Sequence, residues 1–100
     1  MTLQATITRE DSGSKAVYLG TLPGLDGVAE LTLSKTSDTL VIADGTIVPD
    51  SLRGMGVGQQ LVQRLIADAR AAGQRVVPLC PFVRAQAMRH KEEWADVIQF

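Results

Sequence analysis

Apolar residues in the first half of the chain recur at every second position, which is the period of β-strands with one buried face. The clearest example is Ala29, Leu31 and Leu33, which alternate with Glu30 and Thr32. Short segments rich in Gly, Ser, Asp and Pro separate the apolar runs, as expected for turns. The pattern predicts four strands, at residues 3–7, 16–19, 29–33 and 39–43.

The dipeptide Asp44-Gly45 leaves two interpretations of the chain after the fourth run. Asp-Gly is a strong signal for a two-residue hairpin. However, only residues 46–48 precede Pro49, so a hairpin would have little strand to pair. We favour one continuous strand interrupted by a bulge in which Gly45 is the extra, unpaired residue. The hairpin remains the alternative.

From Val57 the apolar period becomes that of an α-helix, with polar residues such as Gln60 mostly on the opposite side. Gly73 is a natural stop just past the last turn. The buried stripe is predicted to contain Val57, Leu61, Val62, Leu65, Ile66 and Ala69.

A short apolar run at residues 76–79 predicts a fifth strand, and Pro78 favours an edge or splayed position for it. Pro81 suits the first position of a second helix that continues to about His90. Strand, helix, strand and helix in succession predict a crossover with parallel pairing. We therefore expect an α/β (α+β) fold, with a mixed sheet of antiparallel N-terminal strands, a β-α-β crossover and a C-terminal helix.

The composition restricts the class of protein. One hundred residues, 45% of them apolar and 21% charged, fit a single globular domain over residues 1–100. A net charge of −1 argues against nucleic acid and anionic membranes as partners, and no segment has the length of a membrane span or the features of a signal peptide. One cysteine favours a cytoplasmic location, and one cysteine with one histidine predicts no metal site.

The segment Arg53-Gly54-Met55-Gly56-Val57-Gly58 is the strongest functional signal. Its glycines allow tight turns and leave amides uncovered, and the following helix adds unpaired amides at its positive end. This combination favours an anion, most simply a phosphate. Gln59 replaces the third glycine of a Rossmann fingerprint, and the Lys-Ser/Thr of a Walker loop is missing. Close packing at a helix start is the alternative explanation.

The spacing of Arg53, Gly56 and Gly58 resembles the pyrophosphate loop of the GNAT acetyltransferases. The segment at residues 77–83, with its Cys-Pro-Phe-Val sequence, is similar to the small, single-domain GNAT-like family often called the YjdJ type. The segments at 46–56 and 94–97 extend this resemblance over residues 29–98. It implies a reduced GNAT fold that uses acetyl-coenzyme A as cosubstrate.

By this resemblance, backbone amides of Gly54, Met55, Gly56, Val57, Gly58 and Gln59 would bind the pyrophosphate. The exposed backbone of Ile47 and Val48 would pair with the pantetheine arm. Arg53 would either neutralise a phosphate or simply lie on the surface. The side chains of Met55 and Val57 are expected to pack, so that their amides matter more.

Cys80 is the catalytic candidate, because the matching cysteine of the resembling family lies near the acetyl thioester. Its expected position at a helix N-terminus would stabilise the reactive thiolate. It could carry the acetyl group, assist transfer in another way, or only fill the core. For His90 a solvated helix end is favoured over a general base, and Trp94 is expected to cover the core.

The resemblance implies transfer of acetyl to an unidentified amine on a small molecule or a protein; a non-catalytic coenzyme A-binding or sensing module is the alternative. Only the turn at residues 11–14 occupies the interval where larger GNAT enzymes place two helices, so the acceptor side should be open. Two differences from relatives stand out. Gly45 replaces a histidine that many of them carry, and Tyr18 lies far from the tyrosine that often protonates the leaving thiolate.

Overall fold

The computed structural model describes residues 3–100, and within them it contains five strands, two α-helices and one short 3-10 helix. Three of the four alternating runs lie in strands and the 3.6-residue run became a helix. The first predicted strand, at residues 3–7, was wrong in position, because β1 begins at Thr6 and extends to Ser12, into the predicted turn. The elements are β1 (Thr6–Ser12), β2 (Lys15–Thr21), β3 (Ala29–Lys35), β4 (Leu40–Ile47), η1 (Asp50–Leu52), α1 (Val57–Ala72), β5 (Arg75–Pro78) and α2 (Pro81–Arg89).

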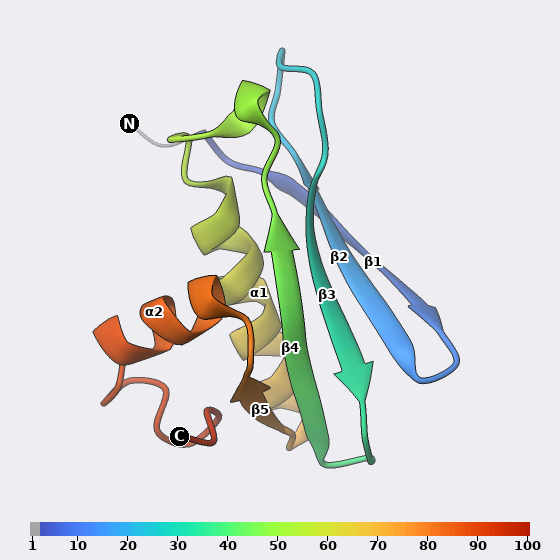
Figure 1. The fold of residues 1–100 in the computed structure, drawn as a ribbon, viewed down its shortest axis with the longest axis vertical. Coiled ribbons are helices and arrows are strands. Elements are labelled where there is room, and N and C mark those ends of the chain that lie inside the picture. Colours follow the sequence, from blue (N-terminus) through green and yellow to red (C-terminus); the bar gives the residue numbers. More distant parts are fainter. Residues whose placement is uncertain (1–2) are drawn as a thin grey trace.

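The five strands form one sheet in the order β1-β2-β3-β4-β5. The first four are antiparallel neighbours, and β5 pairs in parallel with β4 after the chain has passed through α1. Figure 1 shows α1 on one face of the sheet, behind β4 in this view, and α2 beside β4 and β5. The predicted mixed sheet, β-α-β crossover and C-terminal helix are confirmed.

Strand β4 is continuous through Asp44-Gly45, so the hairpin alternative is wrong. Thr32 pairs with Gly45 and Leu33 pairs with Ala43, which confirms a bulge but makes Asp44, not Gly45, the extra residue. Gly45 has no positive φ, so its conformational freedom is not used. The bulged carboxylate is instead fixed by its neighbours, because Asp44 accepts a 2.6 Å hydrogen bond from Ser34 Oγ.

The apolar stripe of α1 packs on the sheet, as its period predicts. A Cβ atom on Gly20 of β2 would lie 3.1 Å from Leu61 and from Val57, so glycine lets the helix approach the strand closely. At its other end α1 terminates at Gly73, which has φ 68° and the expected left-handed conformation. The largest fully buried side chains include Tyr18, Leu31, Leu33, Leu52, Leu61, Leu65 and Ile98.

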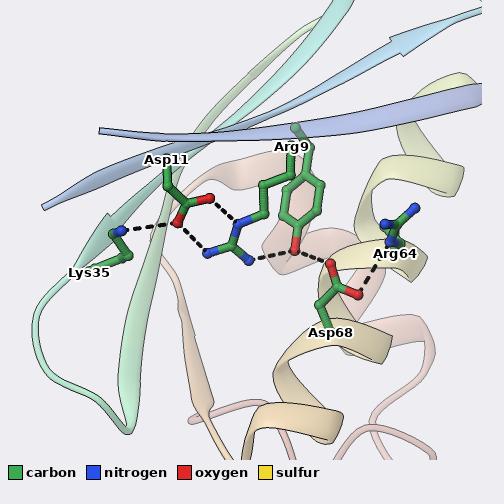
Figure 2. A network of polar contacts seen from close by, with 6 residues as sticks. Arg9, Asp11, Lys35, Arg64 and Asp68 are labelled. Carbon is green, nitrogen blue, oxygen red and sulfur yellow. Dashed lines mark hydrogen bonds and ion pairs between the residues drawn. The ribbon is translucent and has the colours of Figure 1, made fainter. Parts of the chain in front are cut away.

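A polar network joins the C-terminal half of α1 to the outer strands (Figure 2). The Tyr18 hydroxyl donates a 2.7 Å hydrogen bond to Asp68 and accepts one of 2.9 Å from Arg9. Arg64 contacts the other Asp68 oxygen at 3.2 Å. Arg9 also donates two hydrogen bonds, of 2.8 and 3.0 Å, to Asp11. The helix is therefore tied to β1 and β2 by side chains that satisfy one another.

These contacts shift the acid–base equilibria of the network. Burial and the hydrogen bond to Asp68 raise the pKa of Tyr18 to about 12. Hydrogen bonds from Arg9 and Lys35 lower the pKa of Asp11 to about 2. The network is therefore assembled with a neutral phenol and an ionised carboxylate near neutral pH.

Strand β5 occupies the edge of the sheet, as Pro78 predicted. Its outer side is covered by the C-terminal residues, because Val76 donates to Val97 O at 2.8 Å and accepts from Gln99 N at 2.9 Å. Trp94 is only 7% exposed and belongs to the core. Within residues 3–100 neither helix is long and apolar enough to cross a membrane.

Candidate functional site

The parallel pair β4–β5 separates just where the site begins. Pairing ends at Ala43 and Pro78, and the Cys80 amide then donates a 2.8 Å hydrogen bond to Ala43 O before the chain turns into α2. Strand β4 continues to Ile47, a residue that is 64% exposed. Among residues 3–100, no strand pairs with β4 beyond Ala43 on this side, which leaves room for an extended ligand beside its backbone.

The three glycines of the loop after β4 serve two different purposes. Gly54 has φ 74° and Gly56, the N-cap of α1, has φ 82°, a left-handed conformation that side chains disfavour. Gly58 lies inside α1, where a Cβ atom would come within 2.8 Å of the Phe82 ring. The packing explanation therefore applies to Gly58, whereas Gly54 and Gly56 shape the turn.

The same turn leaves a group of backbone donors unused. Among residues 3–100 no acceptor pairs with the amides of Gly54, Gly56, Val57, Gly58 and Gln59. All but the first belong to the N-cap and first turn of α1, so they point outwards along the helix axis. The helix dipole places partial positive charge at the same point.

Met55 differs from the other residues of the loop, because its amide already donates to Leu52 O at 3.4 Å. Met55 as a residue is 38% exposed. An anion could therefore be bound by the amides before and after Met55, but not by that of Met55 itself.

A groove of about 620 Å³ opens in front of these amides. This volume lies within the range of roughly 300–1,000 Å³ that is usual for small-molecule and cofactor sites. The structure brings eight of the nine predicted cofactor-binding residues together here, and the ninth, Ile47, precedes the lining residue Val48 in the sequence. The lining residues are Leu3, Val48, Leu52, Arg53, Gly54, Met55, Gly56, Val57, Gly58, Gln59 and Phe82.

Three of these lining residues were missed in the sequence. Leu52 is fully buried in η1, Phe82 comes from the first turn of α2, and Leu3 comes from the segment before β1. None belongs to the glycine motif or follows it directly. The nearest available signal was Gly58, because a glycine inside a strong helix implies a close neighbour.

Cys80 is the N-cap of α2, as predicted, but its thiol does not cap the helix. Its sulfur lies 3.3 Å from Thr46 Oγ1, and the residue is only 3% exposed. The structure therefore places Cys80 against Thr46, near the end of β4. Cys80 does not line the groove, although Phe82, two residues later in the chain, does.

The charged candidates lie further out. Arg53 lines the groove and forms an ion pair of 3.4 Å with Asp50 in which both side chains are largely exposed. His90 ends α2, stacks on Trp94 with ring centroids 4.4 Å apart and contacts Glu93 at 3.2 Å. It therefore occupies a helix end, as favoured from the sequence. Tyr18 takes part in the network of Figure 2 and does not line the groove.

Nothing in residues 3–100 gathers three or more His, Cys, Asp or Glu side chains into a possible metal site. Backbone amides and one guanidinium line the groove, and the Cys80 thiol lies beside the end of β4, outside that lining.

Comparison with known families gives a direct assignment. The model of the family described as GCN5-related N-acetyl-transferase matches residues 21–97. The matched region runs from the end of β2 to the C-terminal segment and contains the glycine loop and Cys80. A search of curated proteins found no match to the chain. Because the family model covers most of the sequence, including every groove-lining residue except Leu3, the chain belongs to the GCN5-related N-acetyltransferase family.

Proposed function

We propose that this protein is an acetyl-coenzyme A-dependent N-acetyltransferase that acts as one domain in the cytoplasm, and that it belongs to the small YjdJ type. The observation that carries the proposal is the set of unpaired amides at the start of α1, which border a groove beside a free strand edge. A diphosphate would satisfy these donors and meet the positive end of the helix dipole.

In the proposed complex, the diphosphate lies against the amides around Gly56, and the pantetheine arm runs along Ile47 and Val48 like an added strand. This direction leads from the helix start towards Thr46 and Cys80. The acetyl thioester would then lie where β4 and β5 separate. An acceptor amine would approach from the side on which the turn between β1 and β2 replaces additional helices.

The proposed reaction needs few protein groups. The neutral amine nitrogen attacks the thioester carbonyl, a C–N bond forms, and the C–S bond breaks to release the coenzyme thiolate. A backbone amide at the strand edge would stabilise the oxyanion. The proton lost by the amine passes to solvent or to the thiolate, which is a good leaving group and needs no dedicated tyrosine.

Cys80 could assist this transfer or carry the acetyl group itself. Its contact with Thr46 and its low exposure favour the assisting role, because acyl-accepting cysteines are partly accessible. Mass spectrometry after exposure to acetyl-coenzyme A distinguishes the two. We expect no acetyl adduct on Cys80 and reduced but measurable transfer by Cys80→Ala. An adduct, with no transfer by Cys80→Ala, would instead establish a ping-pong route.

A non-catalytic coenzyme A-binding or sensing module is the second candidate. Gly45 supplies no imidazole at the bulge, and the hydroxyl of Tyr18 is bound to Asp68 and Arg9 away from the groove. This candidate predicts stabilisation by the coenzyme without transfer to any amine.

Titration calorimetry tests the proposed function directly. We expect heat of binding with coenzyme A and with acetyl-coenzyme A, and none with NAD as the control dinucleotide. A panel of small amines and lysine-containing peptides then tests transfer by release of free thiol. If neither coenzyme A nor acetyl-coenzyme A binds, both candidates are refuted. Binding without transfer to any amine would favour the sensing module over the enzyme.

A further inference from the structure

One polar side chain of α1 does not face solvent as its helical position suggested. Gln60 holds the segment of residues 3–5, which precedes β1, by two hydrogen bonds. Its carbonyl Oε1 accepts from Ala5 N at 2.8 Å, and its Nε2 donates to Leu3 O at 2.6 Å. The side-chain amide thus pairs with this segment much as a neighbouring strand would.

The segment that Gln60 holds is part of the coenzyme groove. Leu3 lines the groove in front of the glycine loop, and it also lines a second groove of about 600 Å³. Gly56 and Gln59 border both grooves. We call residues 3–5 the wall: Leu3 borders both grooves, Gln4 and Ala5 border the second, and Leu3 shares the first groove with the loop that carries the unpaired amides.

Gln60 is also attached to the anion site through its own backbone. Its amide donates to Gly56 O at 3.2 Å, so it is the first amide of α1 to be paired within the helix. One residue therefore closes the first helical turn and fixes the wall opposite it. Fixing the wall before a ligand arrives reduces the ordering cost of binding.

We propose that Gln60 is a positioning residue that pre-forms the coenzyme groove by clamping residues 3–5 beside the phosphate-binding turn. This role rests on the proposed function, because it concerns the nucleotide end of the same site. Without the clamp, Leu3 must be ordered when the ligand binds, and affinity falls. Gln60 itself need not touch the ligand.

Three variants test the clamp. Gln60→Ala removes both hydrogen bonds, whereas Gln60→Glu keeps an acceptor for Ala5 N and loses the donor to Leu3 O. Gln63→Ala is the matched control, because Gln63 is an exposed residue of the same helix that lines only the second groove, and its side chain makes no hydrogen bond to the described residues. Thermal unfolding by circular dichroism checks that each variant is folded.

The first measurement needs no ligand. Hydrogen exchange followed by nuclear magnetic resonance should show faster exchange of the Ala5 amide in Gln60→Ala than in the wild type or in Gln63→Ala. In Gln60→Glu this amide should retain much of its protection. If the Ala5 amide is equally protected in Gln60→Ala, the clamp does not hold the segment and the proposal is overturned.

The second measurement is the Kd for coenzyme A and for adenosine 3′,5′-bisphosphate, the nucleotide end alone. We expect Gln60→Ala to bind both about fivefold more weakly, the loss expected for about one net hydrogen bond, and Gln63→Ala to bind like the wild type. Gln60→Glu should fall between them, and it replaces Gln60→Ala if that variant does not fold. If the wild type binds coenzyme A, and Gln60→Ala binds it equally well although its Ala5 amide exchanges faster, the positioning role is overturned and the proposed function is not. Absence of binding by the wild type would overturn the proposed function, and this role with it.

Discussion

The two ends of α1 differ in whether their polar groups have hydrogen-bond partners. At its start, the amides of Gly56–Gln59 have no partner among residues 3–100, and they border an open groove. Towards its end, the Asp68 carboxylate contacts both Tyr18 and Arg64, and Arg9 completes the network (Figure 2). Throughout residues 3–100, no buried side-chain nitrogen or oxygen lacks a hydrogen-bond partner.

This difference indicates that the start of α1 serves ligand binding and that its C-terminal half stabilises the fold. Unpaired polar groups are costly when they are buried, so a fold that retains them keeps them where a ligand or solvent can reach them. Paired groups stabilise the fold but offer nothing to a ligand. We therefore expect changes near Gly56 to act on coenzyme binding and changes near Tyr18 to act on unfolding.

The largest effect is expected from Gly56→Ala. Alanine at φ 82° costs about 1–2 kcal/mol, and relief of that strain would turn the first amides of α1 away from the groove. We predict a more than tenfold loss of affinity for coenzyme A by calorimetry. Gly13→Ala is the control, because Gly13 has φ 59° in the turn between β1 and β2 and does not line the groove. It should lose similar stability and no affinity, and equal loss of affinity in both variants would contradict the assignment.

At the other end, Tyr18→Phe should destabilise the fold without changing coenzyme binding. The substitution removes the donor to Asp68 and the acceptor for Arg9, and the loss is expected to be about 1–2 kcal/mol. Urea unfolding measures it as a lower midpoint at constant slope. A weaker coenzyme affinity in this variant would show that the two ends of the helix are coupled.

The pH dependence of stability provides a third test. The pKa of Tyr18 is raised in the folded state to about 12 from its ordinary value of 10.0, so the folded state retains this proton longer than the unfolded chain. The resulting stabilisation is complete below pH 10 and is lost as the pH rises towards 12. Tyr18 is the only tyrosine, so tyrosinate absorbance follows it alone. A native midpoint near 10 would contradict the buried network, and Tyr18→Phe should lack this component of alkaline destabilisation.

The smallest effect is expected from Arg53→Gln. The ion pair with Asp50 joins side chains that are 74% and 92% exposed, so its loss should leave the unfolding midpoint unchanged. Coenzyme affinity should fall about threefold and depend less on salt, because a mobile charge near a phosphate is screened. An unchanged affinity would assign Arg53 to the surface, which was the alternative from the sequence.

Most of the architecture could be predicted from the sequence, because period and turn chemistry are local. The stripe of α1, its stop at Gly73 and the edge position of β5 followed from single residues or short runs. The identity of the bulged residue did not follow. Asp44 is held by Ser34, ten residues earlier in the chain, and this contact exists only once β3 and β4 are paired.

The candidate site divides in the same manner. The sequence predicted an anion site because Gly54, Gly56 and Gly58 permit a tight turn directly before the positive end of a helix. Which of its amides are free was not predictable, because Met55 turned out to donate to Leu52. Nor did the sequence indicate that Gln60 would bind residues more than fifty positions away.

By itself, the amino-acid sequence determined the strand and helix periods, the turn at Gly56 and the position of Cys80 before a helix. These properties depend on residues that are neighbours in the chain. Only the tertiary structure decided that Phe82 and Leu3 wall the groove, that Cys80 meets Thr46, and that the two ends of α1 differ in hydrogen bonding. These features depend on distances between remote segments, which are set when the sheet and its helices pack together.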